Sequence, residues 1–214
     1  MDSTAAIRVG IETTPKKVFA SALDWPGWCR AGRTEADALA ALAASLERFA
    51  PVARAARAGE PPAGPFEVVQ VLPGDATTAF GAPSIVFDAD REPVSAADGQ
   101  RLAALLAAAW AELDRIAASS PLDLRKGPRG GGRDRDRMLE HVAAAHGGYL
   151  RPFGLRLPGS TPDAQVREAM LALLCIPSDG TPPPGAKWPQ RYATRRVAWH
   201  ALDHAWEMQD RATP

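Results

Sequence analysis

The chain has 214 residues, with 25 basic and 25 acidic side chains and no net charge at pH 7. This length suits one medium domain or two small ones. The zero net charge argues against a general nucleic-acid or anionic-membrane binder, which normally carries a basic excess. Because the sequence has no apolar run of about 20 residues and no signal-peptide pattern at its start, we expect a cytoplasmic protein with no membrane partner. Its two cysteines exclude a disulfide framework.

The N-terminal part of the chain alternates between strand and helix patterns. Alternating or β-branched apolar residues predict strands over 7–11, 18–23 and 66–72, with a short further strand at 84–87. The first two strands flank a turn sequence and therefore predict a hairpin. Residues 35–57 follow Thr34 as a candidate N-cap and place apolar side chains at helical spacing, which predicts one amphipathic helix.

The tryptophans and cysteines of the sequence carry no clear catalytic signal. Trp25 and Trp28 either pack in the core or line a ligand pocket, and we expect packing. Neither Cys29 nor Cys175 has a neighbouring histidine or a cationic helix start that would mark a nucleophile. Cys175 ends an apolar helix, so we expect it to be buried and inert.

From residue 93 onward the sequence is helical. Apolar residues at helical spacing predict helices over 96–118, 134–150, 162–175 and 189–211. The fold class is therefore α+β, with a small α+β unit in residues 1–92 followed by a helical unit in residues 93–214.

All four histidines fall on two of these helices, and three of them are placed where one metal ion could bind them. His200 and His204 are four residues apart, so both imidazoles lie on one face of the last helix, a spacing that offers two nitrogen ligands to one metal ion. His141 is the expected third ligand. His146 lies about 140° around the helix from His141, so we do not expect it to bind the same ion. Such pairs also occur without a metal, so a metal-free interpretation stays open.

Two acidic residues accompany the histidine pair. Asp203 directly precedes His204, and Glu207 follows it by three residues. We expect Glu207 and Asp203 to be the catalytic groups, acting as a base or by orienting an imidazole. Two alternative roles for Glu207 stay open: a further ligand of the metal ion, or a solvated surface charge that pairs with Arg211.

The motifs around the histidines resemble the DinB/YfiT-like superfamily over about residues 95–214. The matching residues are His141 in Met-Leu-Glu-His-Val, and His200 and His204 in Trp-His-Ala-Leu-Asp-His. The resemblance implies an antiparallel four-helix bundle in which the three imidazoles bind a divalent metal ion, zinc or nickel, with one position open. Relatives include thiol-dependent S-transferases and a mycothiol-dependent maleylpyruvate isomerase, in which the metal holds a low-molecular-weight thiol as a thiolate nucleophile.

A basic, glycine-rich segment leads into the helix of His141. We expect Arg129 and Arg133 of this segment to clamp a carboxylate or phosphate. Arg196, one helical turn before His200, is the third expected anion-binding residue. The alternative for all three is a solvated surface charge.

The first 65 residues depart from the DinB pattern. Trp25-Pro26-Gly27-Trp28-Cys29, followed by Gly32-Arg33-Thr34-Glu35-Ala36-Asp37-Ala38-Leu39, is similar to HicB-like antitoxin domains over about residues 5–55. The resemblance implies a β-β-α module that binds partners. Because no DNA-binding segment follows and the net charge is zero, we expect an architectural or dimerising module rather than an antitoxin.

Together these patterns predict a metal-dependent enzyme with a small-molecule substrate. The expected reaction is transfer of a thiol such as mycothiol to an electrophile, or a thiol-assisted isomerisation. Two alternatives stay open: a hydrolase with a metal-activated water, and a non-catalytic metal-binding or partner-binding protein built on the HicB-like module. A homodimer is the assembly that such a module suggests.

Overall fold

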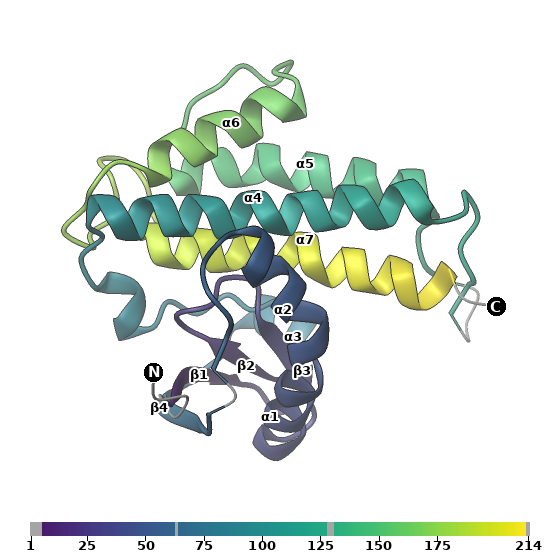
Figure 1. The fold of residues 1–214 in the computed structure, drawn as a ribbon, viewed down its shortest axis with the longest axis horizontal. Coiled ribbons are helices and arrows are strands. Elements are labelled where there is room, and N and C mark those ends of the chain that lie inside the picture. Colours follow the sequence, from purple (N-terminus) through teal and green to yellow (C-terminus); the bar gives the residue numbers. More distant parts are fainter. Residues whose placement is uncertain (1–5, 63, 128–130, 213–214) are drawn as a thin grey trace.

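A four-stranded sheet forms from the N-terminal part of the chain. The computed structural model describes residues 6–62, 64–127 and 131–212. The strands are β1 (Ile7–Thr13), β2 (Val18–Ala22), β3 (Cys29–Gly32) and β4 (Phe66–Pro73), in the order β3-β2-β1-β4 (Figure 1). β1 and β2 form the predicted antiparallel hairpin, and β4 runs parallel to β1. A parallel pair needs a long connection, which here includes two helices.

The helix predicted over 35–57 is in fact two helices, α1 (Glu35–Ala44) and α2 (Leu46–Ala55). The break has a tertiary cause. The indole N–H of Trp28 donates to the carbonyl oxygen of Leu42 at 2.9 Å, and the Ser45 hydroxyl donates to the same oxygen at 2.7 Å. In a continuous helix that oxygen would pair with the amide four residues on. α1 then packs against β2 and β3, whereas α2 turns to contact α4.

The prediction of a short strand at 84–87 is wrong, because these residues form no strand in the structure. The amides of Ser84 and Ile85 donate to the buried carboxylate of Glu12 at 2.8–3.1 Å, so a side chain takes the place of a neighbouring strand. Three short elements of the structure were not predicted from the sequence. They are β3, α3 (Ala76–Phe80) and the 3-10 turn η1 (Asp88–Arg91).

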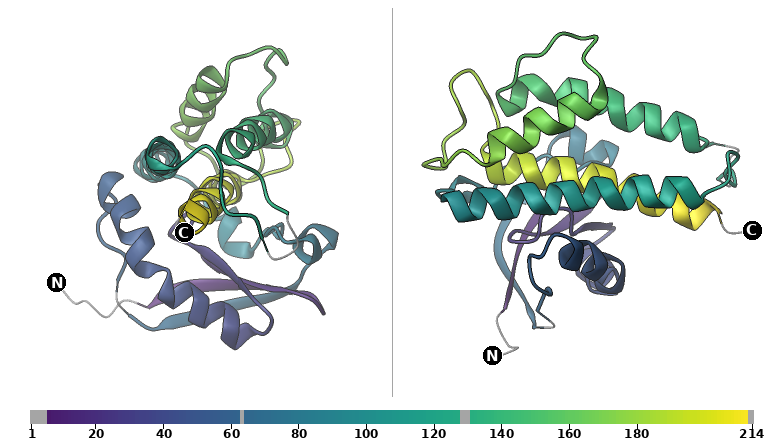
Figure 2. Two further views of the ribbon diagram at one scale, coloured as in Figure 1. Left: turned by 90° about the vertical axis from the view of Figure 1, so that its right-hand side faces the viewer. Right: turned by 45° about the horizontal axis from the view of Figure 1, so that its top comes forward.

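The helices of the C-terminal part lie where the sequence predicts them, within three residues at each end. They are α4 (Ala96–Ser119), α5 (Arg135–Phe153), α6 (Asp163–Leu174) and α7 (Gln190–Ala212). α4 packs along α7 and α6, and α5 packs against α6 and α7 (Figure 2). The described residues thus form a mixed α+β structure of a four-stranded sheet and seven α-helices.

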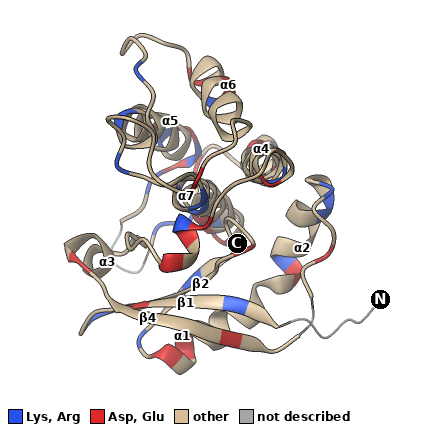
Figure 3. Ribbon diagram, turned by 90° about the vertical axis from the view of Figure 1, so that its left-hand side faces the viewer, with Lys and Arg blue, Asp and Glu red and all other residues tan. Residues whose placement is uncertain are grey.

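α7 is one of the helices that contact the sheet. Figure 3 shows it on the opposite side of β1 and β4 from α1, with charges of both signs spread over the elements. A buried cluster on β2, β3 and α7 includes Phe19 and Trp199, whose rings meet edge-on. Gly27 has a φ of +95°, and a Cβ there would lie 2.7 Å from Leu202, so only glycine allows this close approach.

The main apolar core runs through both predicted units. It contains residues of β1 and β2 together with residues of α1, α2 and α4 to α7. Trp28 is 1% exposed and stacks on Phe49, with ring centroids 5.5 Å apart, while Trp25 meets the same ring edge-on. Both tryptophans therefore pack, as expected. The division at residues 92 and 93 stays a prediction.

One burial prediction is wrong. Cys175 is exposed, whereas Cys29 is buried. Cys175 is the C-cap of α6, and the apolar side chain that closes the core at this helix end is Leu174. No helix within the described ranges combines the length and apolarity needed to cross a membrane.

Candidate metal centre

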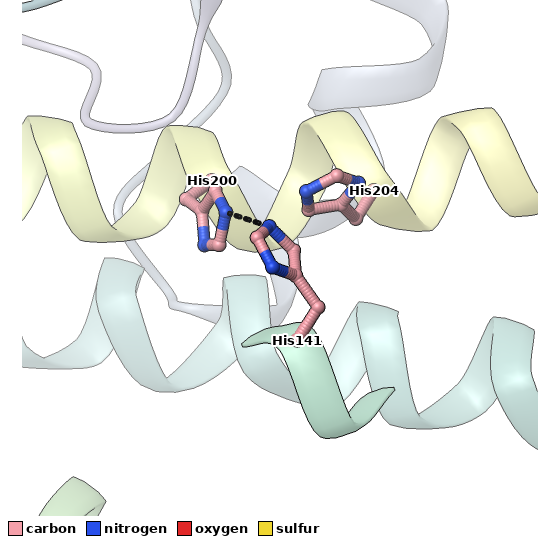
Figure 4. Close-up of side chains that lie close together, drawn as sticks. All are labelled: His141, His200 and His204. Atoms are coloured by element: carbon pink, nitrogen blue, oxygen red, sulfur yellow. Dashed lines mark hydrogen bonds between the residues drawn. The ribbon is translucent and has the colours of Figure 1, made fainter. Parts of the chain in front are cut away.

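Three histidines from two helices meet between α5 and α7 (Figure 4). His200 and His204 project from one face of α7, and His141 reaches toward them from α5. One ligand nitrogen of each residue lies within 4.8 Å of the others. The three ring centroids are 4.7–5.1 Å apart. The structure therefore brings together the three residues that the sequence singles out.

The spacing of these nitrogens fits a divalent metal ion. Nε2 of His141 lies 3.3 Å from Nε2 of His200. Two imidazole nitrogens bound to one tetrahedral zinc ion are separated by about 3.3 Å, because each Zn–N bond is about 2.0–2.1 Å long. In the part of the chain that the structure describes, no fourth histidine, cysteine or carboxylate joins the group. Three ligands with one open position are typical of catalytic rather than structural zinc sites.

Two of the histidines are held in the neutral form that a metal ligand requires. His200 is 6% exposed, and its burial, reinforced by His204 and Arg196, lowers its pKa to about 2. Burial also lowers the pKa of His141, with Arg133 and His204 acting in the same direction. Protons therefore compete weakly with a metal ion for these two imidazoles.

Glu207 orients His204. Nδ1 of the imidazole donates to Oε2 of Glu207 at 3.2 Å, and Arg211 donates to Oε1 at 2.8 Å. With Nδ1 engaged, Nε2 is the nitrogen of His204 that is left for a metal ion. The hydrogen bond from His204 lowers the pKa of Glu207, so the carboxylate stays ionised. The orienting contact and the ion pair with Arg211 are thus both present.

Asp203 lies beside the cluster but bonds to the sheet. Its carboxylate accepts a hydrogen bond from Arg30 of β3 at 3.2 Å. Burial raises the pKa of Asp203, while Arg30 and His204 act against that shift. Within the described residues it makes no hydrogen bond to an imidazole, so its contact is one that fastens α7 to β3.

His146 does not join the histidine cluster, as its helical position predicts. It is fully buried, and Nε2 accepts the indole N–H of Trp110 at 3.0 Å. Nδ1 therefore carries the proton and donates to Asp163 at 2.6 Å. Both nitrogens are occupied, which leaves neither for a metal ion.

The predicted anion-binding arginines differ in their surroundings. Arg133 is exposed, and its charge helps to lower the pKa of His141. Arg196 stacks on aromatic rings one turn before His200. Arg129 lies outside the described residues. Two of the three arginines therefore add positive charge near the histidines, and their contact with a ligand stays a prediction.

The sequence reasoning missed the aromatic residues that surround the centre. The Tyr149 ring lies 5.9 Å from the His200 ring, and the Trp199 ring lies 6.1 Å from it. Trp188 packs against Tyr149 at 5.3 Å. For Trp188 and Trp199, the signal in the sequence was the density of aromatic residues between positions 188 and 206, around the histidine pair. Tyr149 lies outside that stretch.

Neither cysteine belongs to the centre. Cys29 is buried, accepts a hydrogen bond from the Ser21 hydroxyl at 3.1 Å, and has its pKa raised to about 12 by burial. A thiol in that state is a poor nucleophile. Any thiol chemistry at the histidines would therefore use a thiol from solution.

In comparisons with known proteins, no family model, curated protein or solved structure matches this chain.

Proposed function

We propose that the chain is a metal-dependent enzyme of DinB type that activates a low-molecular-weight thiol, such as mycothiol, for transfer to an electrophile or for a thiol-assisted isomerisation. In this proposal α4 to α7 form the antiparallel four-helix bundle of that superfamily. His141, His200 and His204 would hold a divalent ion, zinc or nickel, which supplies Lewis acidity and lowers the pKa of a bound thiol.

The observation that carries the proposal is the geometry of the three imidazoles. Their ligand atoms lie within 4.8 Å of one another, and no fourth protein ligand completes the group among the described residues. Three neutral ligands leave the full charge of a divalent ion in place, and Arg133 and Arg196 add to the positive field at His141 and His200. Such a centre favours an anionic ligand, and a thiolate is one that soft and borderline metal ions prefer.

The carboxylates near the centre support a thiolate over a metal-activated water. Both oxygens of Glu207 accept hydrogen bonds, and Asp203 is bonded to Arg30. A hydrolase normally needs a base poised to take a proton, whereas a thiol with a metal-lowered pKa loses its proton to solvent. Glu207 would then be a positioning residue for His204, and Asp203 would support α7.

The first test is the metal content of the purified protein. We expect about one equivalent of zinc or nickel per chain, lost in His200→Ala and in His204→Ala. His146→Gln is the matched control, because it changes a buried histidine of α5 that uses both nitrogens for hydrogen bonds. Metal-free protein, or equal metal content in all variants, would overturn the proposal.

The second test separates the reaction classes. The metal-loaded protein is assayed with a panel of thiols, mycothiol included, against electrophilic substrates, with and without a chelator. We expect turnover that requires both the thiol and the metal. Thiol-independent hydrolysis would favour the water-activating alternative, and a bound metal with no turnover in any arm would favour a binding protein.

A further inference from the structure

Arg196 stands out among the arginines of α7 because it has no anionic partner among the described residues. Arg195 forms a buried ion pair with Asp90 at 2.6 Å, and Arg211 is paired with Glu207 at 2.8 Å. Arg191 donates to the carbonyl oxygens of Glu92 and Pro93. Arg196 makes none of these contacts, and its Nη1 is buried with no hydrogen-bond partner. A buried guanidinium nitrogen without an acceptor is unfavourable unless a ligand supplies one.

Two aromatic rings hold the Arg196 guanidinium in place. Its central carbon lies 4.9 Å from the Trp199 ring and 5.5 Å from the Tyr149 ring. Contacts with ring faces stabilise the cation and leave its in-plane N–H groups as donors. Stacking also reduces the side-chain freedom that would be lost when the fork of N–H groups binds a planar anion.

The same two rings connect Arg196 to the metal centre. Trp199 and Tyr149 also neighbour His200, with centroid distances of 6.1 Å and 5.9 Å. Arg196 and His200 are four residues apart on α7, so they share one face and are offset by about 6 Å along the axis. Arg196, which has no anionic partner among the described residues, therefore lies about one helical turn from His200 of the histidine cluster.

We infer that a ligand of the histidine centre carries a carboxylate, and that Arg196, whose guanidinium lies over the rings of Tyr149 and Trp199, is the residue that binds it. A carboxylate matches the fork of guanidinium N–H donors and supplies the missing acceptor. This inference rests on the proposed metal centre and adds the substrate class: one reactant is an anion. The carboxylate belongs either to the thiol or to the second substrate.

The first arm of the test uses thiols and the cobalt-substituted protein, whose absorption bands report thiolate binding. 3-Mercaptopropionate is compared with 3-mercaptopropionamide, which has the same length without the charge. We expect the carboxylate to bind about 10- to 100-fold more tightly. Arg196→Met should remove that preference and leave the affinity for the amide unchanged, while Arg196→Lys should restore part of it.

The second arm omits the thiol. Calorimetry compares succinate with succinamide on the zinc-loaded protein, again with Arg196→Met. Discrimination in the first arm alone assigns the carboxylate to the thiol, and discrimination in the second arm alone assigns it to the other substrate. Arg191→Met is the matched control. It removes a positive charge from the same helix, but the guanidinium of Arg191 already donates to two backbone carbonyl oxygens. This variant should preserve the preference for the carboxylate.

The outcomes distinguish this inference from the proposed function. If neither thiol binds the cobalt, the thiol reaction fails, and the succinate arm still decides the role of Arg196. If charged and neutral ligands bind equally in both arms, or if Arg191→Met abolishes the preference as fully as Arg196→Met, the inference is overturned while the metal centre stands.

Discussion

At the scale of single residues, the partners of each histidine decide its role. His141 and His146 both lie on α5. His146 has a donor on one nitrogen and an acceptor on the other, whereas Nε2 of His141 faces Nε2 of His200 at 3.3 Å. Two facing nitrogens with lone pairs repel each other unless a proton or a cation lies between them. That contact is what makes His141 and His200 candidate ligands.

The first prediction concerns Glu207, which contacts Nδ1 of His204. In Glu207→Gln the amide oxygen still accepts the hydrogen bond, but the negative charge that raises the basicity of the imidazole is lost. We expect the affinity for zinc to fall by about tenfold or more, with the fold unchanged, in a competition titration against a coloured chelator.

The control for Glu207→Gln is Glu140→Gln, which removes a surface carboxylate of α5 that pairs with Arg137. Its zinc affinity should match that of the wild type. Equal affinity in both variants would show that Glu207 is only the solvated partner of Arg211.

At the scale of elements, one tryptophan sets the course of the chain after the sheet. The indole N–H of Trp28 donates to the carbonyl of Leu42 and to the hydroxyl of Ser45, both at the end of α1. These bonds hold the junction at which α1, lying on the sheet, gives way to α2, which contacts α4. The break therefore positions the helix layer relative to the sheet.

The second prediction follows from that junction. Trp28→Phe keeps an aromatic ring opposite Phe49 but removes both indole hydrogen bonds and leaves the Leu42 carbonyl with fewer donors. We expect the free energy of unfolding to fall by about 1–3 kcal/mol. Urea denaturation measures this change, and the slope of the unfolding free energy against urea concentration should stay the same. Trp25→Phe is the control, because Trp25 is only partly buried, and it should cost less. Equal losses would mean that ring volume, not the hydrogen bonds, holds the junction.

At the scale of the whole molecule, ion pairs fasten the sheet to the helices. Arg8 of β1 binds Asp24 after β2 and Glu92 before α4, with N–O distances of 2.6 Å in each pair. The buried pair of Arg195 and Asp90 joins α7 to η1. The domain boundary predicted between residues 92 and 93 therefore lies next to residues that form ion pairs with both the sheet and the helices.

The third prediction is the pH dependence of the Arg8 contact. The hydrogen bond from Arg8 lowers the pKa of Glu92, so this pair stabilises the native state above about pH 4.5 and loses that effect as the pH falls through the lowered value. Glu92→Gln should be less stable than the wild type at pH 7, and the difference should shrink toward pH 3. Because Glu92 is 42% exposed, solvent screening keeps the effect below about 1 kcal/mol.

Urea denaturation of both proteins between pH 3 and pH 8 measures this dependence. A difference between wild type and Glu92→Gln that stays constant over the whole range would show that the charge of Glu92 contributes nothing, and that only its packing matters.

Much of the architecture could be predicted because its signals are local. The hairpin of β1 and β2, the cap at Thr34 and the four long helices follow from alternation, spacing and capping chemistry. The two errors in secondary structure fall where a distant side chain overrides the local pattern. Trp28 divides the helix predicted over 35–57, and Glu12 occupies the amides of the strand predicted at 84–87.

The candidate site, too, could be predicted from the sequence only where its features are local. The spacing of His200 and His204 already places two imidazoles on one face, because helical periodicity is a property of neighbouring residues. The Nε2 contact of His141 with His200 depends on how α5 packs on α7. Both nitrogens of His146 are engaged because α5 also meets Trp110 of α4 and Asp163 of α6. Among the described residues, the lack of a hydrogen-bond partner for Nη1 of Arg196 is likewise a result of how the helices pack. Contacts between residues far apart in the chain are set by the packing of the core, so only the tertiary structure decides which of these side chains have partners.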